Sequence, residues 1–288
     1  MTILVTGATG HVGRQVVAQL VAAGAPVRAL TRNPAAARFP SGVEVVQGDL
    51  LEPATVEAAL TGVDRLYLFP EPRTATEVVG AAKRAGVRRI VTLSSGAVTG
   101  GFDLAYQLPV EQAVEASGLE WTHLRPGEFM SNTLRLWGPM IRADRLVRYI
   151  TPDAVSVAVH EADIAAVGVV ALLEDGHTGK AYDMTGPQRI TVREQVAAIG
   201  AALGEEVRFE EVTAQEAKKI LDDQGGWGAE NADFLLGLED YTPGAEMPQL
   251  TAEEWDAMLQ PMPTVEEVTG RPGRTYAQWA LENVEEFR

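Results

Sequence analysis

The chain has 288 residues, enough for one large domain or a large and a small one, and its 46% of hydrophobic residues suits a protein that buries a substantial core. Its 24 Lys and Arg against 40 Asp and Glu give a net charge of −16, which disfavours binding to nucleic acid and to anionic membranes. The absence of cysteine excludes disulfides, thiolate nucleophiles and zinc–thiolate sites.

A metal site is not expected, because the four histidines (His11, His123, His160 and His177) show no metal-ligand spacing. No basic segment or cleavage site of a signal peptide precedes the first apolar stretch, and no apolar run is long enough to span a bilayer. A cytoplasmic location is therefore the default expectation.

The N-terminal stretch 2–13 runs from a short β-branched strand into three glycines at every third position, and helical spacing follows from residue 14. Gly7 is expected to make the tight turn, Gly10 to face a pyrophosphate, and Gly13 to let the helix pack closely on the strand. Because the helix N-terminus attracts an anion, this order of elements favours dinucleotide binding over a turn without a ligand.

A second strand is predicted over 26–32, and it ends at Arg32 with no Asp or Glu beside it. In a dinucleotide fold an acidic residue here would bind the ribose 2′-hydroxyl, whereas an arginine would accept a 2′-phosphate. The position therefore indicates NADP rather than NAD, unless Arg32 is merely solvated surface.

The third and fourth predicted strands, 43–50 and 65–70, bring further candidates to the same edge. Asp49 is within plausible reach of an adenine amino group, or it serves only as a turn or helix cap. Leu68, Phe69 and Pro70 would wall the cofactor, or they are plain core.

A fifth strand over 89–96 delivers the hydroxyls of Ser94 and Ser95 to this edge, and a sixth is predicted over 121–127. Helices are expected at 53–60, 76–85 and 109–116, between the strands. Six strands that alternate with helices predict an α/β fold, a doubly wound parallel sheet of the Rossmann type, with ligands at the carboxyl ends of the strands.

The second half of the chain is less regular. Segment 129–149 mixes apolar residues with arginines and could line a pocket, although a solvated helix face explains it too. Short strands at 155–159 and 180–184 flank a helix that Asp163 would begin, and a capped amphipathic helix is expected over 191–203. We expect an NADP-binding domain over 1–150 and a smaller, mainly α-helical C-terminal domain over 151–288, with some segments returning to the sheet.

Further along the chain we expect a strand at 207–212, a helix at 211–223, a loop at Gly225–Gly228 and a tail from Tyr241 to Arg288 that is helical in pieces. Trp227, Trp255 and Trp279 could build a substrate pocket, or they belong to the core.

Four motifs together resemble the NmrA-like branch of the atypical short-chain dehydrogenases/reductases. They are the glycine stretch 7–13, Thr31-Arg32-Asn33-Pro34, Gly48-Asp49-Leu50 and the run 124–132, Leu-Arg-Pro-Gly-Glu-Phe-Met-Ser-Asn. The later Asp163-Ile164-Ala165 and the run 182–187 extend the likeness to about three quarters of the chain. The resemblance implies a Rossmann domain that binds NADP(H), a smaller C-terminal domain and a substrate cleft between them.

The resemblance also implies positions around the cofactor. These are Thr9, His11 and Val12 at the pyrophosphate, Arg32 with its neighbours Thr31 and Asn33 at the 2′-phosphate, Asp49 and Leu50 at adenine, Leu68 to Pro70 along the ribose, and Ser94, Ser95, Pro126 and Gly127 toward the nicotinamide.

The sequence departs from the wider short-chain reductase pattern at the catalytic pair. Those enzymes use a tyrosine that exchanges a proton with the substrate and a lysine four residues later that lowers the tyrosine pKa. In the register given by Glu111 and Ser117-Gly118, Asp103 and Gln107 stand at the corresponding positions. The nearby Tyr106 is followed four residues later by Val110. The pair is therefore absent.

Two functions fit this pattern. The first is an NADPH-dependent reductase of a small acceptor such as a quinone or an activated alkene or carbonyl, in which Ser95, Tyr106 or water relays a proton. The second is a non-catalytic NADP(H)-binding redox sensor that acts on a protein partner. The missing Tyr/Lys pair favours the sensor, and a second domain able to build a pocket favours the enzyme.

Overall fold

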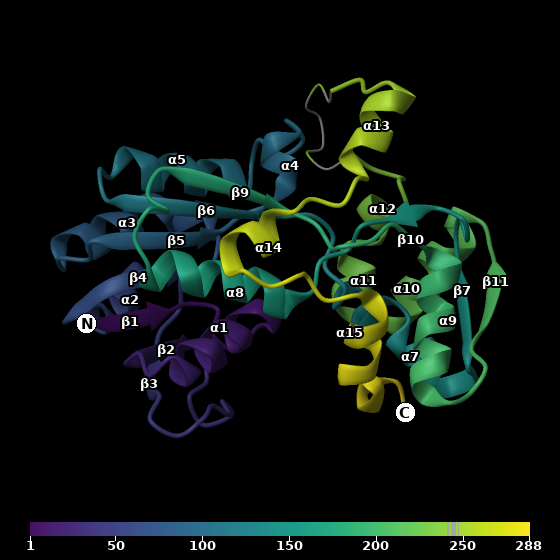
Figure 1. Cartoon of the computed structure of the whole chain (residues 1–288), viewed down its shortest axis with the longest axis horizontal. Helices are drawn as coiled ribbons and strands as arrows, with labels where there is room; N and C mark the ends of the chain where they lie inside the picture. Colours follow the sequence, from purple (N-terminus) through teal and green to yellow (C-terminus); the bar gives the residue numbers. More distant parts are fainter. Residues whose placement is uncertain (241, 243–245, 247) are drawn as a thin grey trace. The chain divides into compact units, whose positions relative to one another are not determined.

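The computed structural model describes residues 1–240, 242, 246 and 248–288, so the predicted start of the tail at Tyr241 lies outside the described residues (Figure 1). The chain forms two compact units. The first comprises Met1–Gly127, Glu161–Met184 and Thr264–Arg271, and the second comprises Glu128–His160, Thr185–Pro263 and Pro272–Arg288. The sequence places the division at residue 150; in the structure the chain changes unit at Gly127 and returns to the first unit twice.

The first unit is built on a seven-stranded sheet with the strand order β3-β2-β1-β4-β5-β6-β9, in which every neighbouring pair is parallel. Its strands are β1 Thr2–Val5, β2 Val27–Thr31, β3 Glu44–Gln47, β4 Val63–Leu68, β5 Arg89–Leu93, β6 Glu120–Pro126 and β9 Lys180–Met184. The order reverses between β1 and β4, which confirms the predicted doubly wound α/β fold. The returning segment is β9, which pairs with β6.

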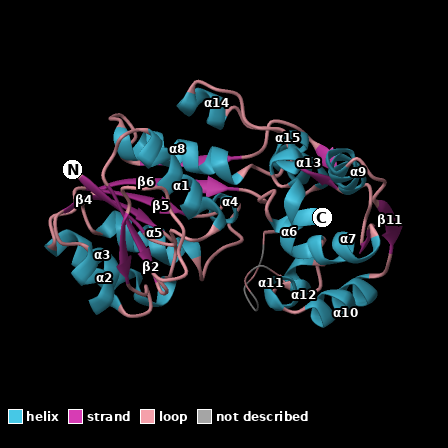
Figure 2. Ribbon diagram, turned by 90° about the horizontal axis from the view of Figure 1, so that it is seen from below, coloured by secondary structure: helices cyan, strands magenta, loops and turns pink. Residues whose placement is uncertain are grey.

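Helices cover both faces of this sheet, as parallel strands require. Helices α1 His11–Ala22 and α8 Glu161–Leu173 pack together on one face, and α2 Pro53–Ala59, α3 Ala75–Arg84 and α5 Gln107–Ala116 cover the other (Figure 2). Shorter helices are η1 Pro72–Thr74, α4 Gly96–Thr99 and α14 Thr264–Thr269. Helix α8 begins at Glu161, two residues before the expected Asp163, and is buried along most of its length.

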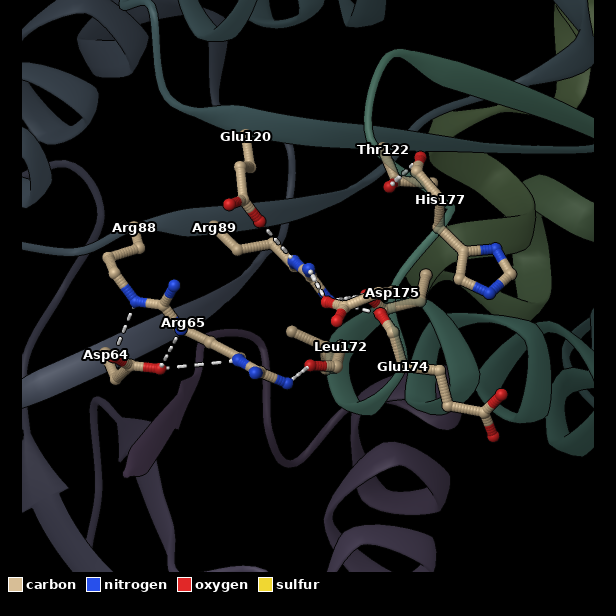
Figure 3. A network of polar contacts seen from close by, with 11 residues as sticks. Asp64, Arg65, Arg88, Arg89, Glu120, Thr122, Leu172, Glu174, Asp175 and His177 are labelled. Atoms are coloured by element: carbon tan, nitrogen blue, oxygen red, sulfur yellow. Dashed lines mark hydrogen bonds and ion pairs between the residues drawn. The ribbon is translucent and has the colours of Figure 1, made fainter.

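Two buried arginines fasten the C-terminal end of α8 to the amino-terminal edge of the sheet (Figure 3). Arg65 on β4 donates to the carbonyl of Leu172, and Arg89 on β5 donates to the carbonyls of Ala171 and Glu174. The last carbonyls of a helix lack partners within it, so these arginines satisfy them and complement the helix dipole. The edge opposite the glycine turn is thus held by structural contacts.

The second unit is mainly helical. Its helices are α6 Asn132–Leu136, α7 Gly138–Asp144, α9 Val192–Leu203, α10 Ala214–Gln224, α11 Gly226–Glu230, α12 Ala232–Leu235, α13 Ala252–Met258, α15 Tyr276–Glu282 and η2 Val284–Phe287. Strands β7 Leu146–Tyr149 and β11 Arg208–Glu211 pair in parallel, and β8 Val155–Ser156 pairs antiparallel with β10 Ile190–Thr191. Thr191 and Glu194 form the predicted capping box of α9.

Several local expectations are corrected in this unit. The segment Gly225–Gly228 was expected to be a loop, but α11 begins at Gly226 and Gly228 packs near Leu221 of α10. Packing here outweighs the poor helix propensity of glycine. Trp279 is fully buried, whereas Trp255 is 48% exposed, so the two share no core.

Two arginines of the basic segment 129–149 form ion pairs with glutamates. Arg145 pairs with Glu205 at 2.6 Å and Arg148 with Glu210 at 3.0 Å. Arg145 directly precedes strand β7 and Arg148 lies on it, so these two arginines do not form the solvated helix face that the sequence offered as an alternative. Among the residues that the structure describes, no helix combines the length and apolar character that a membrane span requires.

Candidate cofactor-binding site

The turn between β1 and α1 depends on its glycines. Gly7 has a φ of +58°, in the left-handed region that favours glycine. A Cβ atom on Gly13 would lie 2.1 Å from the carbonyl oxygen of Gly7, and one on Gly10 would lie 3.2 Å from the same oxygen. The first turn of α1 therefore lies directly against the backbone of the glycine turn, as the sequence predicts for Gly13.

Thr6 fixes the direction in which this turn leaves the sheet. Its Oγ1 donates to the carbonyl of Tyr67 at 3.0 Å and accepts from the backbone N–H of Phe69 at 2.7 Å. The ends of β1 and β4 are thereby joined, and a Cβ on Gly7 would lie 2.9 Å from the Cβ of Phe69. Phe69, 40% exposed, packs over the turn and is not core.

The N-terminus of α1 has the features of an anion site. Gly10 is its N-cap, no side chain caps the helix, and its first turn contains no acidic residue. Arg14, also in this first part of the helix, donates to Nδ1 of His11 at 3.3 Å and to the carbonyl of Gly10 at 3.4 Å. Arginine can only donate, so Nδ1 of His11 accepts and a neutral His11 carries its proton on Nε2. Thr9 is exposed and Val12 is buried.

At the end of β2, Thr31 is buried and its Oγ1 accepts from the N–H of Asn33 at 3.3 Å. Arg32 and Asn33 are exposed. Within the described part of the chain, the guanidinium of Arg32 makes no hydrogen bond or ion pair. An arginine fixed to nothing else can turn toward a phosphate, as the NADP prediction requires.

Leu50, Leu68 and Phe69 lie around one shallow surface hollow, together with Glu71 of the loop before η1. Thr74 donates to the carbonyl of Leu50 at 2.6 Å and ties the loop after β3 to η1. These predicted residues are therefore neighbours in space.

Asp49, beside this hollow in the chain, accepts from the N–H of Leu51 at 3.0 Å through its Oδ1. This contact makes the turn that the sequence offered as the alternative to adenine binding. The other carboxylate oxygen is left for a ligand, so both interpretations remain compatible with the geometry.

Ser94, just after β5, belongs to a buried polar network. Its hydroxyl donates to Glu111 of α5, and Arg125 of β6 donates to the same carboxylate at 2.9 and 2.6 Å. Burial raises the pKa of Glu111, but the bonds from Arg125 and Ser94 outweigh it and hold that pKa below its usual range. Arg125 also donates to Thr99, which donates to Asp183 of β9. The network fixes the strand ends at this edge.

The two predicted catalytic residues have structural contacts of their own. The hydroxyl of Ser95 accepts from the N–H of Ala97 and caps α4. Tyr106 is 44% exposed; partial burial and the charge of Glu71 raise the pKa of its hydroxyl, and Arg73 opposes them. With no lysine to lower this pKa, Tyr106 is a weaker acid than an ordinary tyrosine.

Asp103, which stands where the reductases have their tyrosine, is buried and caps α5. Its carboxylate accepts from the N–H groups of Ala105, Tyr106 and Gln107. These three backbone donors tie the carboxylate of Asp103 to the turn that begins α5. At the position where the reductases have their tyrosine, this chain therefore has a residue that stabilises the start of α5.

Pro126 ends β6, and the N–H of Gly127 donates to the carbonyl of Met184 at 2.9 Å. A Cβ on Gly96 would lie 3.6 Å from the carbonyl oxygen of Pro126, so the ends of β5 and β6 lie close together. The predicted cofactor residues lie at the carboxyl ends of strands in one parallel sheet or directly after them, apart from those in the first turn of α1. They are Gly7, Thr9, Gly10, His11, Val12, Gly13, Thr31, Arg32, Asn33, Asp49, Leu50, Leu68, Phe69, Pro70, Ser94, Ser95, Pro126 and Gly127.

Comparison with known proteins identifies the family of this chain. The model of the NmrA-like family matches residues 1–267. The chain belongs to the NmrA-like family. It is similar to the (4-alkanoyl-5-oxo-2,5-dihydrofuran-3-yl)methyl phosphate reductase of Streptomyces griseus, with 42% identity over 293 residues and 99% of each chain covered. It is 34% identical over 305 residues to the NAD(P)H azoreductase of Xenophilus azovorans, again with 99% of each covered.

Among solved structures, this NmrA-like protein is similar to the NADPH-dependent quinone oxidoreductase of Escherichia coli complexed with NADPH. The TM-score is 0.77 at 26% identity, with 98% of this chain and 99% of the other covered. A mutant NmrA structure matches with a TM-score of 0.70 at 19% identity, which shows the shared fold.

Sequence reasoning missed three residues that shape the NmrA-like site. Thr6 looked like one more β-branched strand residue, Arg14 like an exposed helix residue, and Glu111 like a marker of register. A threonine directly before the first glycine and a basic residue directly after the third were the available signals. Glu111 offered none, because its partners come from β5 and β6.

Proposed function

We propose that this NmrA-like protein is an NADPH-dependent reductase of a small organic acceptor such as a quinone or an activated alkene or carbonyl. The observation that carries the proposal is the glycine turn, where Gly13 lies too close to Gly7 for any side chain and α1 begins without a side-chain cap. A backbone cradle at a helix N-terminus suits a pyrophosphate. Relatives named as reductases, covered over nearly their whole length, support the chemistry.

NADPH, when bound, supplies a hydride, and the chain's own residues bind and orient it. The N-terminus of α1 holds the pyrophosphate, and Arg32 takes the 2′-phosphate, which distinguishes NADPH from NADH. The network of Ser94, Glu111 and Arg125 keeps the ends of β5 and β6 rigid at the edge where the nicotinamide would lie.

The proposed acceptors need only a weak acid to protonate their reduced form. Ser95 and Tyr106 are the proposed relays, and water is the third source. The raised pKa of Tyr106 keeps its hydroxyl protonated at neutral pH, so it can donate a hydrogen bond. An acceptor whose reduced form is only weakly basic, such as a quinone, needs no stronger acid.

Cofactor preference tests the binding half of the proposal. NADPH and NADH are titrated against the wild type, Arg32→Ala and Arg38→Ala, with protein fluorescence as the readout. Arg38 is a matched control, because it is exposed in the same loop and donates to the carbonyls of Ala35 and Ala37. We expect Arg32→Ala alone to weaken NADPH binding and leave NADH binding unchanged. Equal affinity of the wild type for the two cofactors contradicts the role of Arg32.

Turnover tests the catalytic half. NADPH oxidation is followed with a panel of quinones, azo compounds and unsaturated lactones, and at least one acceptor is expected to oxidise NADPH above the protein-free rate. Ser95→Ala and Tyr106→Phe are then compared, and a relay role predicts a lower kcat with unchanged NADPH affinity. If both variants match the wild type, water is the proton source.

The second candidate is an NADP(H)-binding redox sensor that acts on a protein partner. It is favoured by the structural engagement of Ser95 and Asp103, which leaves the position of the reductase tyrosine without an acid. Tight, NADPH-preferring binding without oxidation by any acceptor would support the sensor over the reductase.

A further inference from the structure

A cluster of three potential metal ligands lies between α5 and β6. Glu111 and Glu115 are one helical turn apart on α5, and His123 comes from the facing strand β6. One ligand atom from each residue lies within 4.8 Å of the other two. Residues four apart share a face of a helix, so both carboxylates are directed to the same place.

His123 is the unexplained member of this cluster. Its side chain is fully buried and stacks on Trp121, with ring centroids 4.5 Å apart, yet neither ring nitrogen has a hydrogen-bond partner among the described residues. A buried polar group without a partner destabilises the folded protein, because it has lost its hydrogen bonds to water. No contact of His123 among the described residues replaces these hydrogen bonds. An ion bound to a ring nitrogen would replace one of them.

One separation between ligand atoms matches the distance between two ligands of a single ion. Nε2 of His123 lies 3.4 Å from Oε1 of Glu115 without forming a hydrogen bond to it. Two ligands bound at about 2.0–2.1 Å to a tetrahedral zinc ion lie about 3.4 Å apart, since a tetrahedron's edge is about 1.63 times its radius.

The charges around the cluster also favour a cation. Glu111 and Glu115 contribute two negative charges against the one positive charge of Arg125, which pairs with Glu111. A neutral imidazole offers one nitrogen lone pair, and among the described residues no hydrogen-bond donor occupies either nitrogen of His123. The side chain of Glu115, 44% exposed, connects the cluster to solvent.

We propose that Glu111, Glu115 and His123 form a binding site for a divalent transition-metal ion of the zinc type, with water completing its coordination. A mixed nitrogen and oxygen ligand set selects zinc-like ions over Mg²⁺ and Ca²⁺, which prefer oxygen alone. The site was not visible in the histidine spacing, because its ligands come from two elements. A bound ion would join α5 to β6 next to the carboxylate that holds Ser94.

The test is calorimetric titration of metal-free protein with zinc chloride and separately with magnesium chloride. The wild type is expected to bind one equivalent of zinc and no magnesium at the same concentrations. Glu115→Gln removes a ligand at a partly exposed position and leaves the fold intact. It is expected to weaken zinc binding at least about tenfold, since even outer contacts of metal ligands contribute about 10–100-fold.

Two control variants separate this site from adventitious zinc on the surface. Glu57→Gln removes a carboxylate of similar exposure on α2, and His177→Gln removes a partly buried histidine that bonds to Tyr182. Both should bind zinc as the wild type does. A thermal shift gives an independent readout, because zinc should raise the melting temperature of the wild type and of both controls but not of Glu115→Gln.

Failure of the wild type to bind zinc would overturn the proposal. Equal binding by Glu115→Gln and the wild type, or loss of binding in His177→Gln, would also overturn it. None of these results bears on NADPH binding, which the titrations with Arg32→Ala measure separately.

Discussion

Two glycines inside helices provide a test of the glycine turn. At one of them, helix propensity and packing predict opposite effects of alanine on stability. Gly13 lies in α1 and Gly80 in α3. Replacing a helical glycine by alanine favours the helix by about 1 kcal/mol from propensity alone. If propensity decided the outcome, Gly13→Ala and Gly80→Ala would both stabilise the protein.

Because of packing, we expect alanine to lower the free energy of unfolding at Gly13 and to raise it at Gly80. The added Cβ at Gly13 would meet the carbonyl oxygen of Gly7 at 2.1 Å and its carbonyl carbon at 2.8 Å. These are backbone atoms, so α1 must move away from β1 by about 1 Å, and overpacking of this kind costs about 1–3 kcal/mol or more. At Gly80 the nearest atom is Nη1 of Arg84 at 3.4 Å, the end of a flexible side chain.

Urea denaturation of the wild type and the two variants, followed by circular dichroism, measures the difference. We expect Gly13→Ala to unfold at lower urea and to lose NADPH binding, and Gly80→Ala to unfold at slightly higher urea with NADPH binding unchanged. A Gly13→Ala variant as stable as the wild type would refute the close approach of α1 to the turn.

Three further predictions concern the polar contacts of the first unit. Glu111→Gln removes the charge that compensates Arg125 and should lower the free energy of unfolding, by up to about 3–5 kcal/mol in urea denaturation. Arg89→Met should cost about 1–3 kcal/mol for each carbonyl of α8 that loses its donor, measured in the same way. The hydrogen bond from Arg88 is the main cause that lowers the pKa of Asp64. The ionised carboxylate therefore stabilises the folded protein at neutral pH, and this contribution is lost as the pH falls below about 3.8. Asp64→Asn should flatten that part of the stability–pH curve.

The sequence was sufficient for the sheet because each of its first six strands carries a local signal. Strands such as Arg89–Leu93 are short and rich in β-branched residues, and helices with clear ends separate them. The glycine spacing then placed the turn at Gly7 and the packing contact at Gly13. These features depend on residues near one another in the chain.

The remaining features depend on partners far apart in the chain. The pairing of β9 with β6 joins Lys180–Met184 to Thr122–Pro126, and the chain first passes through the second unit. Glu111 acquires its role from Ser94 and Arg125, and no spacing rule links the three. The short helix α11 forms despite its glycines because Gly228 packs against α10. Tertiary contacts that override local propensity cannot be read from a single sequence.

The hydrogen bonds of the polar groups near β5 limit which acceptors the proposed reductase can protonate. Ser94 donates to Glu111, and Asp103 accepts from the backbone N–H groups at the start of α5, whereas Ser95 only accepts from Ala97 and keeps its O–H to donate. Ser95 and Tyr106 are the relays proposed at this edge, and the raised pKa of Tyr106 makes it a poor acid. A site of this kind can bind and orient a hydride donor but contributes little to proton transfer. Simple ketones, whose alkoxide product is strongly basic, should therefore be poor acceptors, and quinones should be better ones at equal NADPH saturation.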